Sequence, residues 1–266
     1  MTNRSAPDII DDRNRDPARA APADAGDDAV ILQPEVPAAL TFNGTSHAVM
    51  MVSPYDLEDF LTGFCLSEGI IDDASQVQIK SVRQTLRGYV LDADLDPICA
   101  DRLSDRQRTL EGRSGCGLCG IQSLEALSLE ATRKVTPGDM SQDVVLRAID
   151  ALPEFQKRNR DSGGLLHASA FANAGGDIIL AREDIGRHNA LDKVLGALAR
   201  DTIATDGGFI LMTSRCSYEI VTKTVQCGIG GLVTLSGPTL TAVNLARQAG
   251  LTLICRERRG RFRRFS

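Results

Sequence analysis

Apolar and polar residues first follow a pattern typical of β-strands near residue 38. Residues 38–42 and 46–52 are short apolar segments, and Asn43-Gly44 lies between them. An Asn-Gly pair readily adopts the left-handed backbone conformation that a tight hairpin turn requires. The pattern therefore predicts a β-hairpin.

The period of the apolar residues then changes to that of an α-helix. Four residues recur at the i, i+3, i+4 and i+7 positions that share one helical face, namely Leu57, Phe60, Leu61 and Phe64. We expect Ser53 to cap the amino end of this helix through its hydroxyl, and Gly69 to end it. Another pair of strands is predicted at 77–82 and 88–91, and residues 30–95 are interpreted as scaffold.

Beyond residue 141, predicted strands and helices alternate. Ser141 is expected to cap a helix that Pro153 stops, and Gly175-Gly176 is expected to connect a hairpin. The predicted strands are 165–172, 177–181, 208–213, 232–235 and 251–255, and the predicted helices are 185–199, 218–227 and 239–249. This alternation is typical of a layered α/β fold with a largely parallel sheet, in which ligands bind at the carboxyl ends of strands.

Composition narrows the class of protein. The chain has 266 residues, 42% of them hydrophobic, and a formal net charge of −5, which allows a sizeable core in one or two domains. Residues 1–28 hold seven aspartates and four arginines with few large apolar residues, a composition that predicts a disordered leader. The sequence contains no apolar run of membrane length, and its seven cysteines suit a reducing cytoplasmic compartment.

A glycine-rich segment at 113–120 carries the most distinctive chemistry. It reads Arg-Ser-Gly-Cys-Gly-Leu-Cys-Gly and contains Cys116 and Cys119, the only closely spaced cysteines in the chain. So much glycine disfavours helix and strand, so we expect an adaptable loop. The pair is compatible with half of a zinc site, a thioredoxin-like dithiol, two incidental thiols, or a nucleophilic thiol that carries a group. We favour the carrier thiol, because the other cysteines and histidines are scattered and Arg113 would promote a thiolate.

Polar residues gather after two of the predicted strands. The charged run 182–193 contains Asp184 and His188, and the run after the next strand contains Ser214 and Ser217. Hydroxyls and backbone amides that lead into a helix form a site for an anion such as phosphate. A helix start with surface ion pairs is the alternative for the first run, but its density of charge favours a functional site.

The last eleven residues are strongly basic, although the protein is acidic overall. They contain six arginines and a single acid, Glu257, and arginine side chains bind phosphate in a bidentate fashion. A solvated tail is the simplest alternative. A nucleic-acid surface is less favoured, because the rest of the chain is acidic and few aromatic residues are interleaved.

Five separate segments carry a resemblance to a known family. They are Asn43-Gly44 with His47, Leu-Ser-Glu-Gly-Ile-Ile at 66–71, Ser-Gly-Cys-Gly-Leu-Cys-Gly at 114–120, Glu-Asp-Ile-Gly-Arg-His-Asn-Ala-Leu-Asp-Lys at 183–193, and Ser-Arg-Cys-Ser-Tyr-Glu at 214–219. Together they resemble the FdhD family, the formate dehydrogenase accessory sulfurtransferases. The resemblance implies an α/β fold in which a three-layer α/β/α cytidine-deaminase-like domain with a basic tail occupies 141–266. A smaller α+β subdomain at 29–140 would end in the Cys-Gly-Leu-Cys-Gly loop. The zinc-ligand pattern of deaminases is missing from the sequence, so the resemblance does not extend to deaminase chemistry.

The resemblance also implies a sulfur relay. Cys116 would accept sulfur as a persulfide from a cysteine desulfurase, with Cys119 as its partner in the loop. The sulfur would pass to a molybdenum bis(molybdopterin guanine dinucleotide) cofactor, bound as a substrate, that is delivered to formate dehydrogenase. The family's nucleotide-binding segment aligns with Arg256, Glu257, Arg258, Arg259, Gly260 and Arg261, and the guanine and phosphate pockets would use Asp184, His188, Ser214 and Ser217.

Two positions depart from the usual pattern of that family. Cys255-Arg256 replaces a Gly-Phe pair, which leaves Arg258 and Arg261 as phosphate ligands, and Cys216 replaces a small residue and is interpreted as packing. The resemblance further implies a homodimer. We also expect no structural metal and no binding to nucleic acid or to a membrane. A cofactor-binding chaperone that uses the Cys-x-x-Cys as a metal site is the alternative function, and a nucleotide-binding dithiol reductase is a third.

Overall fold

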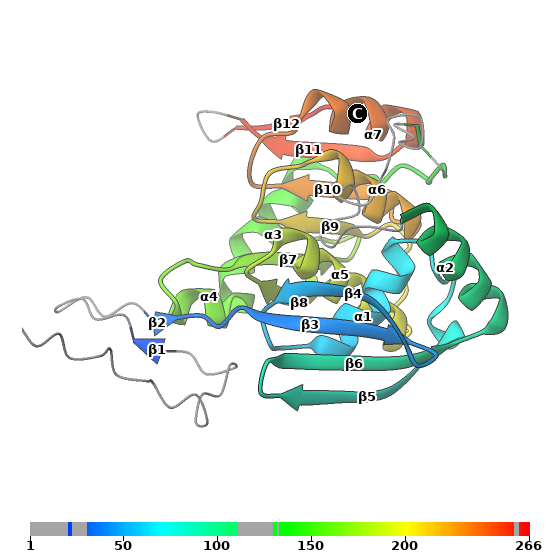
Figure 1. Cartoon of the computed structure of the whole chain (residues 1–266). Coiled ribbons are helices and arrows are strands. Elements are labelled where there is room, and N and C mark those ends of the chain that lie inside the picture. The colour runs from blue at the N-terminus through cyan, green and yellow to red at the C-terminus, as the bar shows by residue number, and fades with distance from the viewer. Residues whose placement is uncertain (1–20, 23–30, 111–129, 132, 258–260) are drawn as a thin grey trace, which may run out of the picture.

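The amino-terminal half of the chain forms a four-stranded sheet covered by a helix (Figure 1). The computed structural model describes residues 21–22, 31–110, 130–131, 133–257 and 261–266. The sheet has the order β4-β3-β6-β5, with strands β3 (Val36–Phe42), β4 (Thr45–Val52), β5 (Val77–Thr85) and β6 (Gly88–Leu95). Both predicted strand pairs are confirmed as antiparallel hairpins. Asn43 and Gly44 have φ angles of 50° and 77°, as the predicted turn requires.

Helix α1 (Leu57–Ser67) supplies the core that covers this sheet. Its predicted apolar face is buried against residues such as Leu40 and Leu91, and Gly69 follows the helix with a φ angle of 64°, as expected. The predicted amino cap is wrong. The residue before the helix is Asp56, with a φ angle of 53° and no side-chain capping bond. Ser53 lies further upstream, where its polar groups bond to a segment that is distant in sequence.

The carboxyl-terminal half of the chain contains a six-stranded sheet with the order β12-β11-β10-β9-β7-β8. Its strands are β7 (His167–Ala172), β8 (Ile178–Asp184), β9 (Phe209–Met212), β10 (Gly231–Thr234), β11 (Thr252–Arg256) and β12 (Phe262–Arg264). Only the β9–β10 and β10–β11 pairs are parallel, so the expectation of a largely parallel sheet is wrong. The sheet is mixed because the turn around Gly176 folds β8 back on β7, and β12 folds back on β11.

Helices cover both faces of the six-stranded sheet (Figure 1). They are α3 (Gln142–Phe155) on one face and α5 (Arg187–Arg200), α6 (Tyr218–Gln226) and α7 (Leu240–Ala249) on the other. Side chains alternate along β9, so Ile210 and Met212 pack with α5, α6 and α7, whereas Phe209 and Leu211 pack with α3. The sheet and its helices therefore form three layers.

The two halves of the molecule meet where α1 packs on α5. A β-carbon on Gly63 of α1 would lie 1.7 Å from the carbonyl oxygen of Asp192, and one on Gly196 of α5 would lie 1.9 Å from the carbonyl oxygen of Asp59. No side chain fits at either position, so glycine allows the two backbones to approach closely. The joint between the halves depends on this approach.

A buried charged cluster joins the same helices to α6. The amine of Lys223 lies 2.8 Å from Glu68 and 3.0 Å from Asp192, and it donates a hydrogen bond to the hydroxyl of Ser67. Burial lowers the pKa of Lys223, but the two carboxylates outweigh that effect and raise it. The amine therefore stays protonated and cannot act as a base towards the serine, so the cluster is structural.

Some elements were not predicted from the sequence. They are the helices α2 (Pro97–Leu110) and α4 (Lys157–Asp161), the short 3₁₀ helix η2 (Ala74–Gln76) and the strand β12. The predicted stop at Pro153 is also wrong, since α3 continues to Phe155. In the last turn of a helix, proline removes one backbone hydrogen bond without disrupting the turns before it. Ser141 caps α3 as predicted, by accepting from the backbone of Val144.

Part of the predicted organisation lies outside the described residues. Strands β1 (Ala21–Pro22) and β2 (Ile31–Leu32) pair with each other, but the rest of the predicted disordered leader, 1–20 and 23–28, is outside. So is the segment 111–129, which contains the predicted loop at 113–120. The predicted domain boundaries after residues 28 and 140 stay predictions. None of the helices that the structure describes is long and apolar enough to cross a lipid bilayer.

Candidate functional site

One edge of the six-stranded sheet collects polar side chains from several elements. Asp184 at the end of β8 pairs with His167 at the start of β7, and Thr234 at the end of β10 pairs with Cys255 near the end of β11. Ser169 on β7 pairs with the last residue of β9. The carboxyl ends of β8, β9, β10 and β11 thus meet the amino end of β7, and we call this line of residues the carboxyl edge. Layered α/β proteins bind ligands at such edges.

Three helices begin at the carboxyl edge, each after the end of a strand. Helix α5 begins after Gly186, α6 after Ser217 and α7 after Thr239. Thr239 accepts a hydrogen bond from the first turn of α7, whereas Gly186 and Ser217 make no side-chain capping bond. The first backbone N–H groups of α5 and α6 thus lack a side-chain cap. Together with the positive ends of the helix dipoles they favour an anion at this edge.

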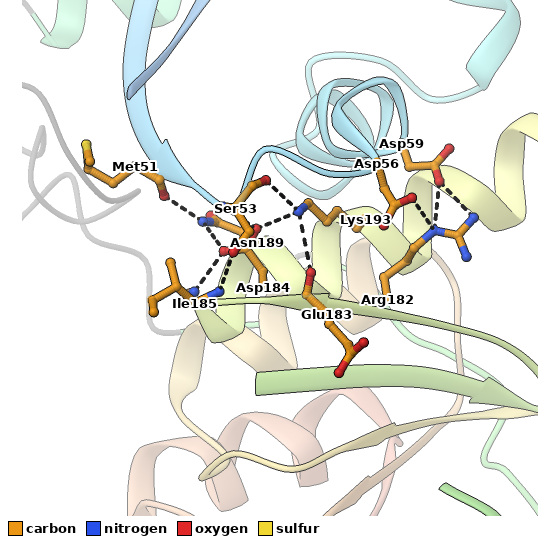
Figure 2. Close-up of polar contacts among 11 residues, drawn as sticks. Met51, Ser53, Asp56, Asp59, Arg182, Glu183, Asp184, Ile185, Asn189 and Lys193 are labelled. Atoms are coloured by element: carbon orange, nitrogen blue, oxygen red, sulfur yellow. Dashed lines mark hydrogen bonds and ion pairs between the residues drawn. The ribbon is translucent and has the colours of Figure 1, made fainter. Parts of the chain in front are cut away.

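Asp184 is the buried centre of the turn that leads from β8 into α5 (Figure 2). Its carboxylate lies 2.6 Å from the amine of Lys193 and accepts hydrogen bonds from the backbone of Ser53, the backbone of Gly186 and the side chain of Asn189. Both side chains of the ion pair are 0% exposed. Four protein donors therefore occupy this carboxylate, which fixes the turn and has no position left for a ligand.

The same turn is bonded to the amino-terminal half of the chain (Figure 2). The backbone N–H of Ile185 donates to the hydroxyl of Ser53, and Lys193 donates to the carbonyl oxygen of Ser53. Arg182 lies 2.8 Å from Asp59 on α1. Burial lowers the pKa of Lys193, and the ion pair with Asp184 offsets part of that effect. The first half of the chain, expected to be scaffold only, thus holds the start of α5 in place.

His188 and Glu219 face each other from the first turns of α5 and α6. The Nε2 atom of His188 lies 2.9 Å from a carboxylate oxygen of Glu219, but the contact does not have the geometry of a hydrogen bond. The pKa of Glu219 is lowered, chiefly by His188 and further by Arg187. The pair links the starts of the two helices that lack side-chain caps.

Buried polar groups without a hydrogen-bond partner cluster at the carboxyl edge. Among the described side chains these atoms are Ser169 Oγ, Arg187 Nε, His188 Nε2 and Ser217 Oγ. Burial lowers the pKa of the neighbouring His167, and the positive charge of Arg187 adds to the effect. Buried polar atoms are nearly always paired, so this group has the donors that a polar, negatively charged ligand needs.

Basic residues extend the carboxyl edge at β11. Arg256 at the end of β11 and Arg261 just before β12 are both exposed, and the backbone N–H of Glu257 donates to the carbonyl oxygen of Arg261. The Glu257 carboxylate pairs with Arg263 at 2.7 Å. Ser214 is 3% exposed, and its hydroxyl donates to the carbonyl oxygen of Arg215. The described part of the predicted basic segment thus lies largely in β11 and β12 rather than in a free tail.

The structure brings together only some of the residues predicted to form the site. His188, Ser214 and Ser217 lie at the carboxyl edge, and Asp184 lies beneath it in the buried turn. Cys116, Cys119, Arg258, Arg259 and Gly260 lie outside the described residues. Sequence reasoning did not select Arg187 or Glu219, although both lie inside the motifs that carry the resemblance. Within the part of the chain that the structure describes, no cluster of three or more histidine, cysteine or acidic residues is arranged to hold a metal ion.

The fold and this edge define a class of protein: a mixed α/β protein of two packed halves whose carboxyl edge carries cationic and unpaired polar groups suited to an anionic ligand. The chain belongs to the FdhD/NarQ family, whose model matches residues 33–266.

Relatives and a solved structure agree with this membership. The chain is 46% identical over 220 residues to the sulfur carrier protein FdhD of Xanthomonas euvesicatoria, covering 83% of this chain and 78% of the relative. It is 44% identical over 224 residues to that of Bordetella parapertussis, covering 83% and 79%. The crystal structure of a candidate formate dehydrogenase accessory protein from Desulfotalea psychrophila has the same fold. The TM-score is 0.69 at 22% identity, over 93% of this chain and 95% of that one.

Proposed function

We propose that this protein is a sulfur carrier that serves the maturation of formate dehydrogenase. Cys116 takes sulfur as a persulfide from a cysteine desulfurase, and the sulfur passes to a molybdenum bis(molybdopterin guanine dinucleotide) cofactor bound as a substrate. Family membership and relatives of 44–46% identity that are named sulfur carriers support the carrier role. The enzyme class is that of a sulfurtransferase.

The observation that carries the cofactor part of the proposal is the cluster of unpaired buried groups at the carboxyl edge. Arg187 and Ser217 offer donors beside two helix starts that have no side-chain cap, and Arg256 and Arg261 add exposed charge. Phosphate oxygens accept bonds from such N–H and guanidinium groups. Asp184 acts as a positioning residue, because its carboxylate already accepts four protein donors.

The sulfur step is an exchange between a thiolate and a persulfide. The Cys116 thiolate attacks the terminal sulfur of the desulfurase persulfide, a new S–S bond forms on Cys116, and the desulfurase thiolate leaves. No net oxidation or reduction occurs in this exchange. Cys119 then attacks the inner sulfur of the Cys116 persulfide, so that a Cys116–Cys119 disulfide forms, the persulfide S–S bond breaks and the outer sulfur leaves as hydrosulfide. Arg113 stabilises the Cys116 thiolate before loading.

The test is the intact mass of the protein after incubation with a cysteine desulfurase and cysteine. The wild type is expected to gain one sulfur that a reductant removes, and Cys116→Ser is expected to lose this gain. Cys99→Ser is the matched control, because Cys99 is a buried thiol in the hydrophobic core of the amino-terminal half. If Cys119 takes part in release, Cys119→Ser will load sulfur and then transfer it slowly.

Two outcomes would contradict the sulfur carrier. A gain of sulfur that persists in Cys116→Ser would place the carrier elsewhere. No gain in the wild type, with zinc or molybdenum retained through Cys116 and Cys119, would establish the alternative, a cofactor-binding chaperone that uses these thiols as a metal site.

We also propose a cytidine-deaminase-like arrangement for the three layers and a cytoplasmic homodimer. Helices on both faces of the six-stranded sheet support the cytidine-deaminase-like arrangement.

The five described cysteines are free thiols, which suits a reducing compartment such as the cytoplasm. The edge strand β4 exposes Val49 and Met51, each at 47%, as apolar surface for a second copy. Light scattering that gives a monomer mass at micromolar concentration would contradict the dimer.

A further inference from the structure

One carboxylate at the carboxyl edge lies among groups that favour an anion. Glu219 is the second residue of α6 and faces His188 in the first turn of α5. The first N–H groups of both helices lack a side-chain cap. The pKa of Glu219 is lowered, chiefly by His188 and further by Arg187, so the carboxylate is charged at neutral pH. A negative charge at this position repels phosphate, so an anionic ligand alone does not explain it.

The neighbouring carboxylates are already bonded within the protein. Asp184 has a 0% exposed side chain and accepts from four protein donors. Glu183 is 5% exposed and accepts from two backbone N–H groups in the first turn of α4, at 2.7 and 3.0 Å. Glu257 pairs with Arg263 at 2.7 Å. Each of these three carboxylates therefore receives strong donors from the protein itself.

Glu219 lacks such donors. Within the part of the chain that the structure describes, its one hydrogen-bond or ion-pair contact is with Nε2 of His188 at 2.9 Å, and that contact does not have hydrogen-bond geometry. The Glu219 side chain is 19% exposed and that of His188 is 26% exposed, so a ligand can reach both. The two oxygens of a carboxylate offer about four lone-pair positions. Glu219 therefore has room to accept two N–H donors while it stays beside His188.

We propose that Glu219 determines which ring binds at the carboxyl edge, by accepting two hydrogen bonds from a ring that carries an amino group next to a ring N–H. Guanine presents this pair of parallel donors, and so does the pterin ring of molybdopterin. Adenine presents a lone pair beside its amino group, and hypoxanthine lacks the amino group. The inference rests on the proposed function, because the proposed cofactor supplies both suitable rings.

The two kinds of charge at this edge would then divide the ligand between them. Arg187 Nε and Ser217 Oγ are buried without a hydrogen-bond partner and can donate to phosphate oxygens. Ser217 precedes Glu219 by two residues, and Arg187 precedes His188 by one. Donors for the phosphates and an acceptor for the ring therefore lie at the same two helix starts. Hydrogen bonds to a charged group discriminate strongly between ligands, because a mismatched ring leaves the carboxylate without its donors.

The first experiment compares three nucleoside diphosphates by calorimetry with the full chain. Inosine diphosphate differs from guanosine diphosphate only in lacking the amino group, and adenosine diphosphate replaces the ring N–H by a lone pair. The wild type is expected to bind guanosine diphosphate at least tenfold more tightly than either of the others, as the loss of one charge-assisted hydrogen bond requires. Equal affinities for all three would overturn the role of Glu219.

The second experiment repeats the series with Glu219→Gln, which keeps the size of the side chain and replaces one acceptor oxygen by a donor. The variant is expected to lose the preference for guanosine diphosphate and to bind xanthosine diphosphate more tightly than the wild type does. Xanthine has a carbonyl oxygen in place of the amino group, which matches the new donor. Glu154→Gln, on the helix that covers the opposite face of the sheet, is the control and should behave as the wild type.

Pyrophosphate separates recognition of the ring from support of the helix starts. It has no ring, so Glu219→Gln should bind it at least as tightly as the wild type, because a repelling charge is removed. An equal loss of pyrophosphate and guanosine diphosphate would show that Glu219 only supports the helices, and would overturn the proposal.

Two further results decide the remaining questions. If the wild type binds none of the diphosphates, the nucleotide site of the proposed function is wrong and the role of Glu219 is overturned with it, whereas equal binding of all of them overturns the role of Glu219 alone. Pterin-6-carboxylate distinguishes the two suitable rings. If it displaces guanosine diphosphate from the wild type, Glu219 accepts from a pterin as well, and if it does not, guanine is the ring that Glu219 selects.

Discussion

At the scale of single residues, Asp184 forms a fully buried ion pair with Lys193. Removing its charge in Asp184→Asn leaves the Lys193 ammonium buried without its ion-pair partner. Loss of one member of a buried ion pair costs about 3–5 kcal/mol, so the free energy of unfolding in urea should fall by that amount. The matched control is Asp177→Asn, whose partner Arg147 is 3.5 Å away with both side chains exposed. It should change stability by less than about 1 kcal/mol. Equal losses in the two variants would contradict the structural role of Asp184.

Glu219, also a single residue, is expected to make the free energy of unfolding depend on pH. Its pKa lies below the ordinary value of 4.5, chiefly because of His188. Because the pKa of Glu219 is lower in the folded state, its contribution to the free energy of unfolding is complete above pH 4.5. The contribution is lost as the pH falls through the pKa of the folded state. The free energy of unfolding of the wild type should therefore exceed that of Glu219→Gln near neutral pH, and the two should converge in acid. Urea titrations at several pH values test this, with the exposed Glu154→Gln as the control. A difference between the wild type and Glu219→Gln that grows as the pH falls would contradict this prediction.

At the scale of elements, the close approach of α1 and α5 depends on two glycines. In Gly196→Ala the new β-carbon would lie 1.9 Å from a backbone oxygen of α1, and backbone cannot move aside as a flexible side chain can. We expect a loss of about 3 kcal/mol or more in the free energy of unfolding. Gly237→Ala is the control, since nothing lies within 4 Å of its added β-carbon. Wild-type stability in Gly196→Ala would show that the helices separate at little cost.

At the scale of the whole molecule, a ligand at the carboxyl edge should stabilise both halves together. Guanosine diphosphate, the nucleotide end of the proposed cofactor, is expected to raise the midpoint of thermal unfolding, because a ligand that binds only the folded state adds about 2.7 kcal/mol at one hundred times its dissociation constant. Arg256→Gln and Arg261→Gln should each weaken binding about tenfold or more, as hydrogen bonds to charged groups contribute roughly 1.5–3 kcal/mol. Added salt should weaken binding in the wild type.

Arg87→Gln is the control for those two variants. Arg87 is an exposed arginine in the turn between β5 and β6, outside the carboxyl edge. This variant should bind guanosine diphosphate as the wild type does. If all three variants lose affinity equally, general charge attraction rather than a site at β11 holds the nucleotide.

Much of the local structure could be predicted because local sequence causes it. The Asn43-Gly44 hairpin, the apolar face of α1 and the glycine that follows α1 depend on backbone preferences within a few residues. The polar run that contains His188 was also recognised as a site candidate by its density of charge. The start of α1 was mispredicted because Ser53 has two possible partners, the helix and a turn 131 residues away, and only packing selects the second.

The sequence by itself determined most of the elements, the family motifs and the Cys-x-x-Cys segment that indicates the chemistry, since each depends on residues that are neighbours along the chain. The tertiary structure decided which of the nominated groups are available to a ligand. It buried Asp184 among four donors and left Arg187 Nε and Ser217 Oγ without a hydrogen-bond partner. These outcomes depend on contacts between segments that only the packing of the two halves and the order of the strands bring together.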